Sequence, residues 1–77
     1  TYLLNTTAND KIFAYVRKNK WNEVLVILNF SKEKVEFSIE DENVSGVFKN
    51  VFDSTKRDFN NGKDFIFKVS DFAVFEK

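Results

Sequence analysis

The chain has 77 residues, of which 43% are hydrophobic and 31% charged, and its 12 Lys and Arg side chains balance 12 Asp and Glu side chains. A chain of this length buries only about 60% of the surface that its unfolded form exposes, so we expect one small domain, residues 1–77, with a marginal core. It contains no Cys, His, Pro or Met. The missing Cys and His exclude the common zinc sites, disulfides, thiol catalysis and an imidazole general base, and with them most classes of enzyme.

The balanced charge argues against a nucleic-acid partner, because sequence-independent binding to phosphates needs an excess of Lys and Arg on one surface. No apolar run approaches the roughly 20 residues of a membrane-spanning helix, and the first residues lack the layout of a signal peptide. We therefore expect no nucleic-acid and no membrane partner. The chain does not begin with Met, which leads us to expect part of a longer polypeptide or a matured product.

The first two predicted strands are apolar on both faces. Residues 11–17 read Lys-Ile-Phe-Ala-Tyr-Val-Arg, and residues 23–30 read Glu-Val-Leu-Val-Ile-Leu-Asn-Phe. The polar stretch 18–22 between them predicts a hairpin loop. Strands of this kind are typical of positions covered on both sides, whereas a sheet of a small sandwich normally has one face in water.

Two explanations for these doubly apolar strands stay open. One is a strongly curved sheet whose own ends and loops cover the second face. The other is docking on a larger neighbouring domain, which leaves an apolar patch on the chain by itself. The candidate inter-domain face consists of Phe13, Tyr15, Leu25 and Ile27.

Four further strands are predicted after these two. Residues 34–40 alternate between apolar and polar side chains, which predicts a strand with one face in water. Further strands are expected over residues 47–53, 64–69 and 72–76, where Phe and Val recur at a period of two. No window shows a sustained helical period. The sequence therefore predicts an all-β fold, a small antiparallel β-sandwich of Greek-key type with six to eight strands.

Two turns are predicted between these strands. Residues 41–43 read Asp-Glu-Asn and form the first. The pair Asn61-Gly62 predicts a type I′ hairpin turn, because both central residues of that turn need a positive φ. Residues 58–64 superficially resemble a calcium-binding loop, but Gly62 comes one position early and Val69 stands where a bidentate Glu is needed. The hairpin is the preferred interpretation.

Two of the predicted strands, taken in order, carry a resemblance to a known family. Residues 9–17 read Asn-Asp-Lys-Ile-Phe-Ala-Tyr-Val-Arg, and residues 23–31 end in Asn-Phe-Ser. They resemble the start of the small C-terminal β-sandwich of α-amylase-family glycoside hydrolases, of the bacterial α-amylase and α-glucosidase type. The closing segment 69–76 is similar to the last strand of that family, although it lacks a Pro and has Phe72 where Tyr is usual.

The resemblance implies a non-catalytic accessory domain that packs on and stabilises the catalytic (β/α)8 barrel of the same polypeptide. The parent would be a glycoside hydrolase acting on α-glucans such as starch, with its catalytic carboxylates on barrel strands that this chain does not contain. Retaining hydrolysis needs two carboxyl groups about 5 Å apart, whereas the carboxylates here fall mostly in predicted turns or on solvent faces. We expect no catalytic, cofactor-binding or metal-binding residue in the chain. We expect a bacterial periplasmic or secreted location in preference to the cytoplasm.

Trp21 is the candidate carbohydrate contact. It falls in the predicted hairpin loop among Asn19, Lys20 and Asn22, and a flat ring beside amide groups suits stacking on a sugar. The alternative function is therefore a carbohydrate-binding module that contacts α-glucans through Trp21. The competing interpretations are a ring folded back on its own hairpin or packed on an adjacent domain. A third hypothesis, an oligonucleotide-binding barrel with exposed Phe rings, is disfavoured by the charge balance.

Overall fold

In the computed structural model, which describes residues 1–77, the chain forms eight strands in two antiparallel sheets. The strands are β1 (Tyr2–Leu3), β2 (Ile12–Lys18), β3 (Glu23–Asn29), β4 (Val35–Ser38), β5 (Val47–Asn50), β6 (Lys56–Asp58), β7 (Asp64–Phe67) and β8 (Phe72–Glu76). One sheet has the order β1-β2-β3-β8-β5-β6, and β4 pairs with β7 in the other. The predicted all-β sandwich is confirmed.

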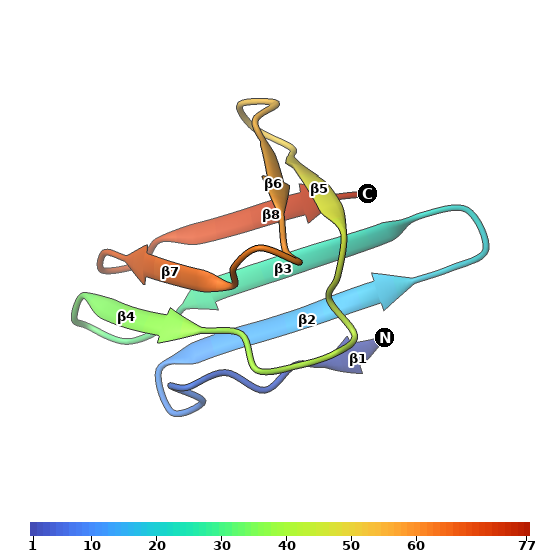
Figure 1. Cartoon of the computed structure of the whole chain (residues 1–77). Helices are drawn as coiled ribbons and strands as arrows, with labels where there is room; N and C mark the ends of the chain where they lie inside the picture. Colours follow the sequence, from blue (N-terminus) through green and yellow to red (C-terminus); the bar gives the residue numbers. More distant parts are fainter.

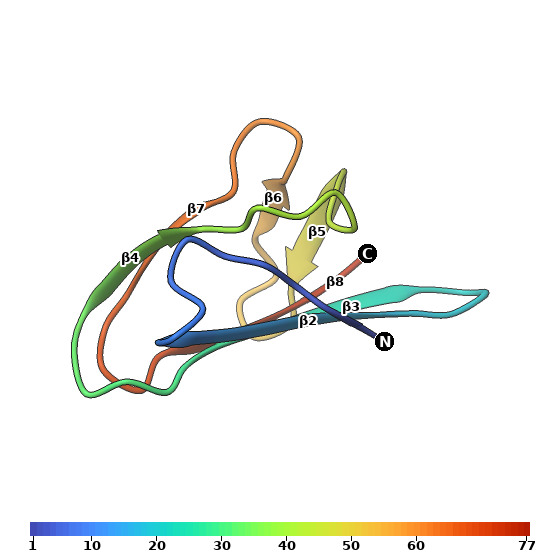
Figure 2. The same cartoon turned by 90° about the horizontal axis from the view of Figure 1, so that it is seen from below.

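The long strands β2, β3 and β8 form a flat layer, and the other large elements lie on one side of it (Figures 1 and 2). The β4–β7 sheet covers part of that side, and the β5–β6 hairpin, which rises steeply from β8, covers another part (Figure 1). β2 and β3 are joined by seven residue pairs. β5 is joined to β8 by only two, Lys49 with Glu76 and Asn50 with Phe75.

The core between the two sheets contains 16 buried hydrophobic residues. Six of the ten Phe residues belong to it, namely Phe37, Phe48, Phe59, Phe65, Phe67 and Phe75. Phe59 makes edge-to-face contacts with Phe48 and Phe75, at centroid distances of 5.3 and 5.4 Å. Because such aromatic pairs add stabilisation beyond the area that they bury, these rings tie β5 and β8 together through the loop after β6.

The Asn29 side chain closes one end of the sandwich. It is buried, and its amide donates hydrogen bonds of 2.9 Å to the carbonyl oxygens of Glu33 and Lys68. Its Oδ1 accepts from the main-chain N–H and the hydroxyl of Ser31, at 3.0 and 2.7 Å. The first and last residues of the Asn-Phe-Ser motif thus hold the segments before β4 and after β7 against the end of β3.

The two predicted turns have different outcomes. The first is confirmed, since the N–H of Asn43 donates to Asp41 Oδ1 at 2.9 Å. The type I′ turn predicted at Asn61-Gly62 is wrong, because neither residue has a positive φ. β6 pairs with β5 and β7 pairs with β4, so the segment between β6 and β7 crosses from one sheet to the other. The glycine with a positive φ, of 82°, is Gly46.

Candidate functional site

Strand register decides which side chains share a face of the flat layer. Phe13 of β2 pairs with Leu28 of β3, and Leu28 pairs with Phe72 of β8. Tyr15 of β2 likewise pairs with Val26 of β3, and Val26 pairs with Val74 of β8. Directly opposed residues of antiparallel strands project to the same side of the sheet. These pairs therefore form two rows on the side that faces away from the core.

We call this surface the outer apolar face. Its members are Leu3, Phe13, Tyr15, Val26, Leu28, Phe52, Phe72 and Val74. No element of the chain covers it (Figure 2), and Phe72 is 56% exposed. The rings of Phe13 and Tyr15 lie 5.7 Å apart, and those of Phe52 and Phe72 lie 5.6 Å apart. A sheet curved over by its own loops is therefore not the explanation of the doubly apolar strands.

On the side of the β2–β3 loop, the outer apolar face is bordered by a row of four residues, three of which are charged. Arg17 pairs with Val24, Val24 with Glu76, and Glu76 with Lys49. This row therefore carries positive and negative side chains next to the two apolar rows. An apolar centre with a polar rim is the composition of protein–protein interfaces.

Leu25 and Ile27, expected on the candidate inter-domain face, are not part of it. Both are 0% exposed and belong to the core. Val26 and Leu28 occupy the outer side of β3 in their place. Because successive strand residues point to opposite faces, a shift of one residue in the assumed pairing exchanges the two sides. The short β2–β3 loop places Lys18 opposite Glu23 and thereby sets this register. Counting residue pairs back from Lys18 and Glu23 identifies Val26 and Leu28 as the residues that share a side with Tyr15 and Phe13.

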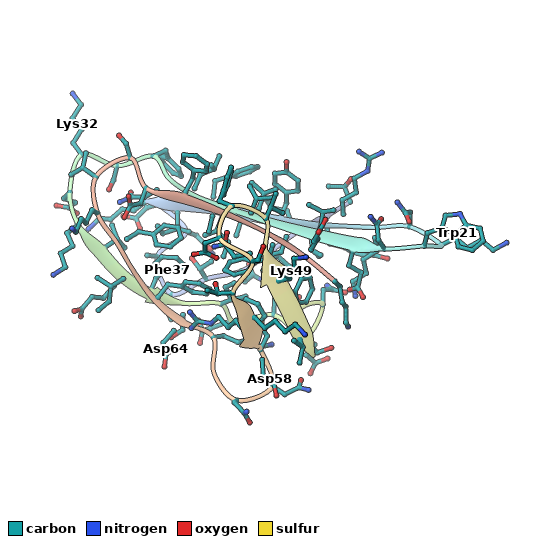
Figure 3. All side chains as sticks on the ribbon, turned by 90° about the horizontal axis from the view of Figure 1, so that it is seen from above. Trp21, Lys32, Phe37, Lys49, Asp58 and Asp64 are labelled. Carbon is teal, nitrogen blue, oxygen red and sulfur yellow. The ribbon has the colours of Figure 1, made fainter.

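Trp21 lies at the tip of the β2–β3 hairpin, which extends beyond the rest of the sandwich (Figure 3). Its side chain is 85% exposed, and Lys20 Nζ lies 5.3 Å from the ring centroid. A shallow hollow of about 290 Å³ adjoins it. The lining residues are Asn19, Lys20, Trp21, Asn22, Glu23 and Lys77. The indole is thus neither folded into the core nor covered by the hairpin.

A larger groove, of about 690 Å³, runs along the β4–β7 sheet. The Arg57 guanidinium lies over the Phe65 ring, 4.0 Å from its centroid, and donates a hydrogen bond to the carbonyl of Asp64. The Asp64 carboxylate in turn accepts from the Ser38 hydroxyl. Burial lowers the pKa of Arg57 from its ordinary value. The sequence did not indicate this groove, because Arg57 and Asp64 belong to strands of different sheets.

Among its side chains the structure brings together no group of three or more carboxylates that could hold a metal ion. It also contains no helix with the length and hydropathy needed to span a membrane.

A small β-sandwich with one bare apolar face has the form of an accessory domain. The comparison with known families agrees, since residues 12–64 match the alpha-amylase SusG C-terminal domain. This match covers more than half of the chain, and the chain belongs to that family. The resemblance to the C-terminal domains of α-amylases is thereby confirmed.

A relative among characterised proteins is the maltogenic alpha-amylase of Bacillus acidopullulyticus. It is 25% identical over 76 residues, which make up 99% of this chain but only 13% of the relative. The chain thus spans a small part of the length of the protein that it matches. No solved structure matches the chain.

Proposed function

We propose that the chain is the non-catalytic C-terminal domain of a glycoside hydrolase acting on α-glucans, and that it packs on and stabilises the catalytic (β/α)8 barrel of the same polypeptide. The observation that carries this proposal is the outer apolar face. The family is that of a C-terminal domain, and most of the length of the relative lies outside the matched region. We therefore propose that the partner of the outer apolar face is another domain of the same polypeptide.

The size of the outer apolar face supports a stabilising role. Complete burial of a large apolar side chain contributes about 1.5–3 kcal/mol, so covering eight partly exposed ones contributes roughly 1 kcal/mol each. The sum is comparable to the whole free energy of unfolding of a small domain, about 5 kcal/mol or more. Docking through this face would thus stabilise both the domain and its partner.

The test is a pair of substitutions in the full-length enzyme. Leu28→Glu with Phe72→Glu places two charges at the centre of the outer apolar face. We expect the melting temperature to fall by about 5 °C or more, because two charges are then desolvated in the interface. The kcat/KM for α-glucans should stay close to that of the parent at a temperature where both are folded.

The control substitution is Ile66→Glu. Ile66 is 61% exposed on the small sheet, so the change has the same chemistry on a surface outside the outer apolar face. It should leave the melting temperature within about 1 °C, as most surface substitutions do. An unchanged melting temperature in the Leu28 and Phe72 variant, or an equal loss in the Ile66 variant, would count against the proposed docking.

A further inference from the structure

We propose that the tip of the β2–β3 hairpin is a binding site for α-glucan chains, with Trp21 as its stacking platform. The class of ligand rests on the proposed function, whereas the site itself is argued from the geometry of the tip. Trp21 is the single hydrophobic residue that lines the hollow at the tip. A flat aromatic ring among polar groups is the combination that accommodates the apolar and hydroxylated faces of a sugar.

The backbone of the tip is held in one arrangement. Asn19 Oδ1 accepts hydrogen bonds from the N–H groups of Trp21 and Asn22, at 2.8 and 2.9 Å. The N–H of Asn19 donates to the carbonyl of Asn22 at 3.0 Å and closes the turn. Ordering a loop on binding costs free energy, and a loop that is already ordered avoids this cost. The indole is therefore presented by a preorganised turn.

Lys20, Glu23 and Lys77 place charges of both signs around the hollow. The Glu23 carboxylate lies 3.5 Å from Lys18 Nζ and 3.3 Å from Lys77 Nζ, so it is paired on both sides. Asn22, whose side chain carries an amide, also lines the hollow. Carboxylate, ammonium and amide groups together offer both acceptors and donors to hydroxyl groups. A nucleic acid would instead require an excess of positive charge.

The same composition distinguishes the tip from a protein-docking surface. Energetically important positions of protein interfaces lie in well-packed surroundings from which water is excluded. Around Trp21 the other lining residues are polar or charged. The charged row of Arg17 and Glu76 separates the tip from the outer apolar face. The tip is therefore a distinct surface, and its partner is the hydroxyl-rich chain that a glucan provides.

The experiment uses the fact that Trp21 is the only tryptophan of the chain. Titration of the 77-residue chain with maltoheptaose should change the tryptophan emission in a saturable way, with a dissociation constant of about 1 mM, as expected for a shallow site. Cellohexaose, in which the glucose units are β-linked, should cause no saturable change. Far-UV circular dichroism verifies that the chain is folded during the titration.

Substitutions then locate the site. Trp21→Ala, followed through the amide NMR signals of residues 19–23, should lose at least about tenfold in affinity for maltoheptaose, because the stacking area is removed. Phe30→Ala is the matched control, since Phe30 is an exposed aromatic residue that directly follows the other end of β3. It should bind maltoheptaose like the parent chain.

Three results would overturn the proposal. They are the absence of saturable binding, equal responses to maltoheptaose and cellohexaose, and an unchanged affinity in Trp21→Ala. If Trp21→Ala instead lowers the melting temperature of the full-length enzyme without changing glucan affinity, the tip belongs to the domain interface. None of these results alters the test of the outer apolar face, which depends on Leu28 and Phe72 alone.

Discussion

The side-chain amide of Asn29, at the end of β3, donates a 2.9 Å hydrogen bond to the carbonyl of Lys68, which lies 39 residues further along the chain and just beyond β7. This bond joins the two sheets at one end of the sandwich. A polar side chain can hold such a position because its hydrogen bonds are satisfied inside the protein.

Replacing Asn29 with Ala should therefore lower the free energy of unfolding by about 2–3 kcal/mol, because the buried Asn29 side chain loses its hydrogen bonds to Glu33, Lys68 and Ser31. The control is Asn61→Ala, which removes one exposed 3.2 Å hydrogen bond to Asp58 and should cost less than about 0.5 kcal/mol. Urea unfolding followed by far-UV circular dichroism measures both. Equal losses in the two variants would contradict a linking role for Asn29.

The two glycines should respond differently to alanine. Gly46 has a φ of 82°, a conformation that costs a residue with a Cβ about 1–2 kcal/mol. A Cβ at Gly62 would meet nothing within 4 Å, and the φ of Gly62 is not positive. Gly62→Ala should be neutral or stabilise by up to about 1 kcal/mol through the unfolded state. A clear destabilisation by Gly62→Ala would instead support a type I′ turn.

Neighbouring positions of β3 should behave in opposite ways. Leu28→Thr combined with Phe72→Thr removes exposed apolar surface and should change the free energy of unfolding by less than about 1 kcal/mol while reducing self-association of the chain. Ile27→Thr places a hydroxyl in the core and should cost about 3 kcal/mol. Sedimentation equilibrium and urea unfolding measure the two effects. If Ile27→Thr is the milder change, the assigned faces of β3 are wrong.

Asp41 should make the stability depend on acidic pH. Its pKa lies below its ordinary value of 3.8, mainly because its carboxylate accepts the N–H of Asn43, and also that of Asn5. The folded form therefore holds its proton less tightly than the unfolded form. The resulting stability is fully present above about pH 4 and is lost as the pH falls through the lower pKa of the folded state.

Asp41→Asn should thus be less stable than the parent chain near pH 6, and the difference should shrink towards about pH 2. Urea unfolding at a series of pH values gives this difference directly. A gap that stays constant over the whole range would show that the charge of Asp41 is not responsible.

Local patterns were sufficient to predict most of the sandwich. The period-two alternation identified six strands, because burial on one side of a strand repeats every second residue. β1 is too short to show a period, and β6 has the sequence Lys-Arg-Asp without an apolar residue, so neither was predicted. Four of the predicted strands, those at β3, β4, β5 and β7, end earlier than expected.

The residues of a candidate site could be predicted only where the site is formed by residues that are close together in the sequence. The position of Trp21 in a hairpin loop follows from the polar stretch around it. The composition of the outer apolar face depends on register across three strands, and the expectation failed at Leu25 and Ile27 for that reason. The contact between Arg57 and Asp64 depends on the crossing from one sheet to the other, which no local pattern encodes.

The sparse attachment of β5 to β8 has a consequence for how the protein opens. Two residue pairs hold the β5–β6 hairpin to the rest of its sheet, so separating it breaks few main-chain hydrogen bonds. Amide hydrogens in β5 and β6 are expected to exchange with solvent through this partial opening before those of β2 and β3. The opened form uncovers Phe48 and an unpaired edge of β8, and such an edge is a template on which a second chain can pair.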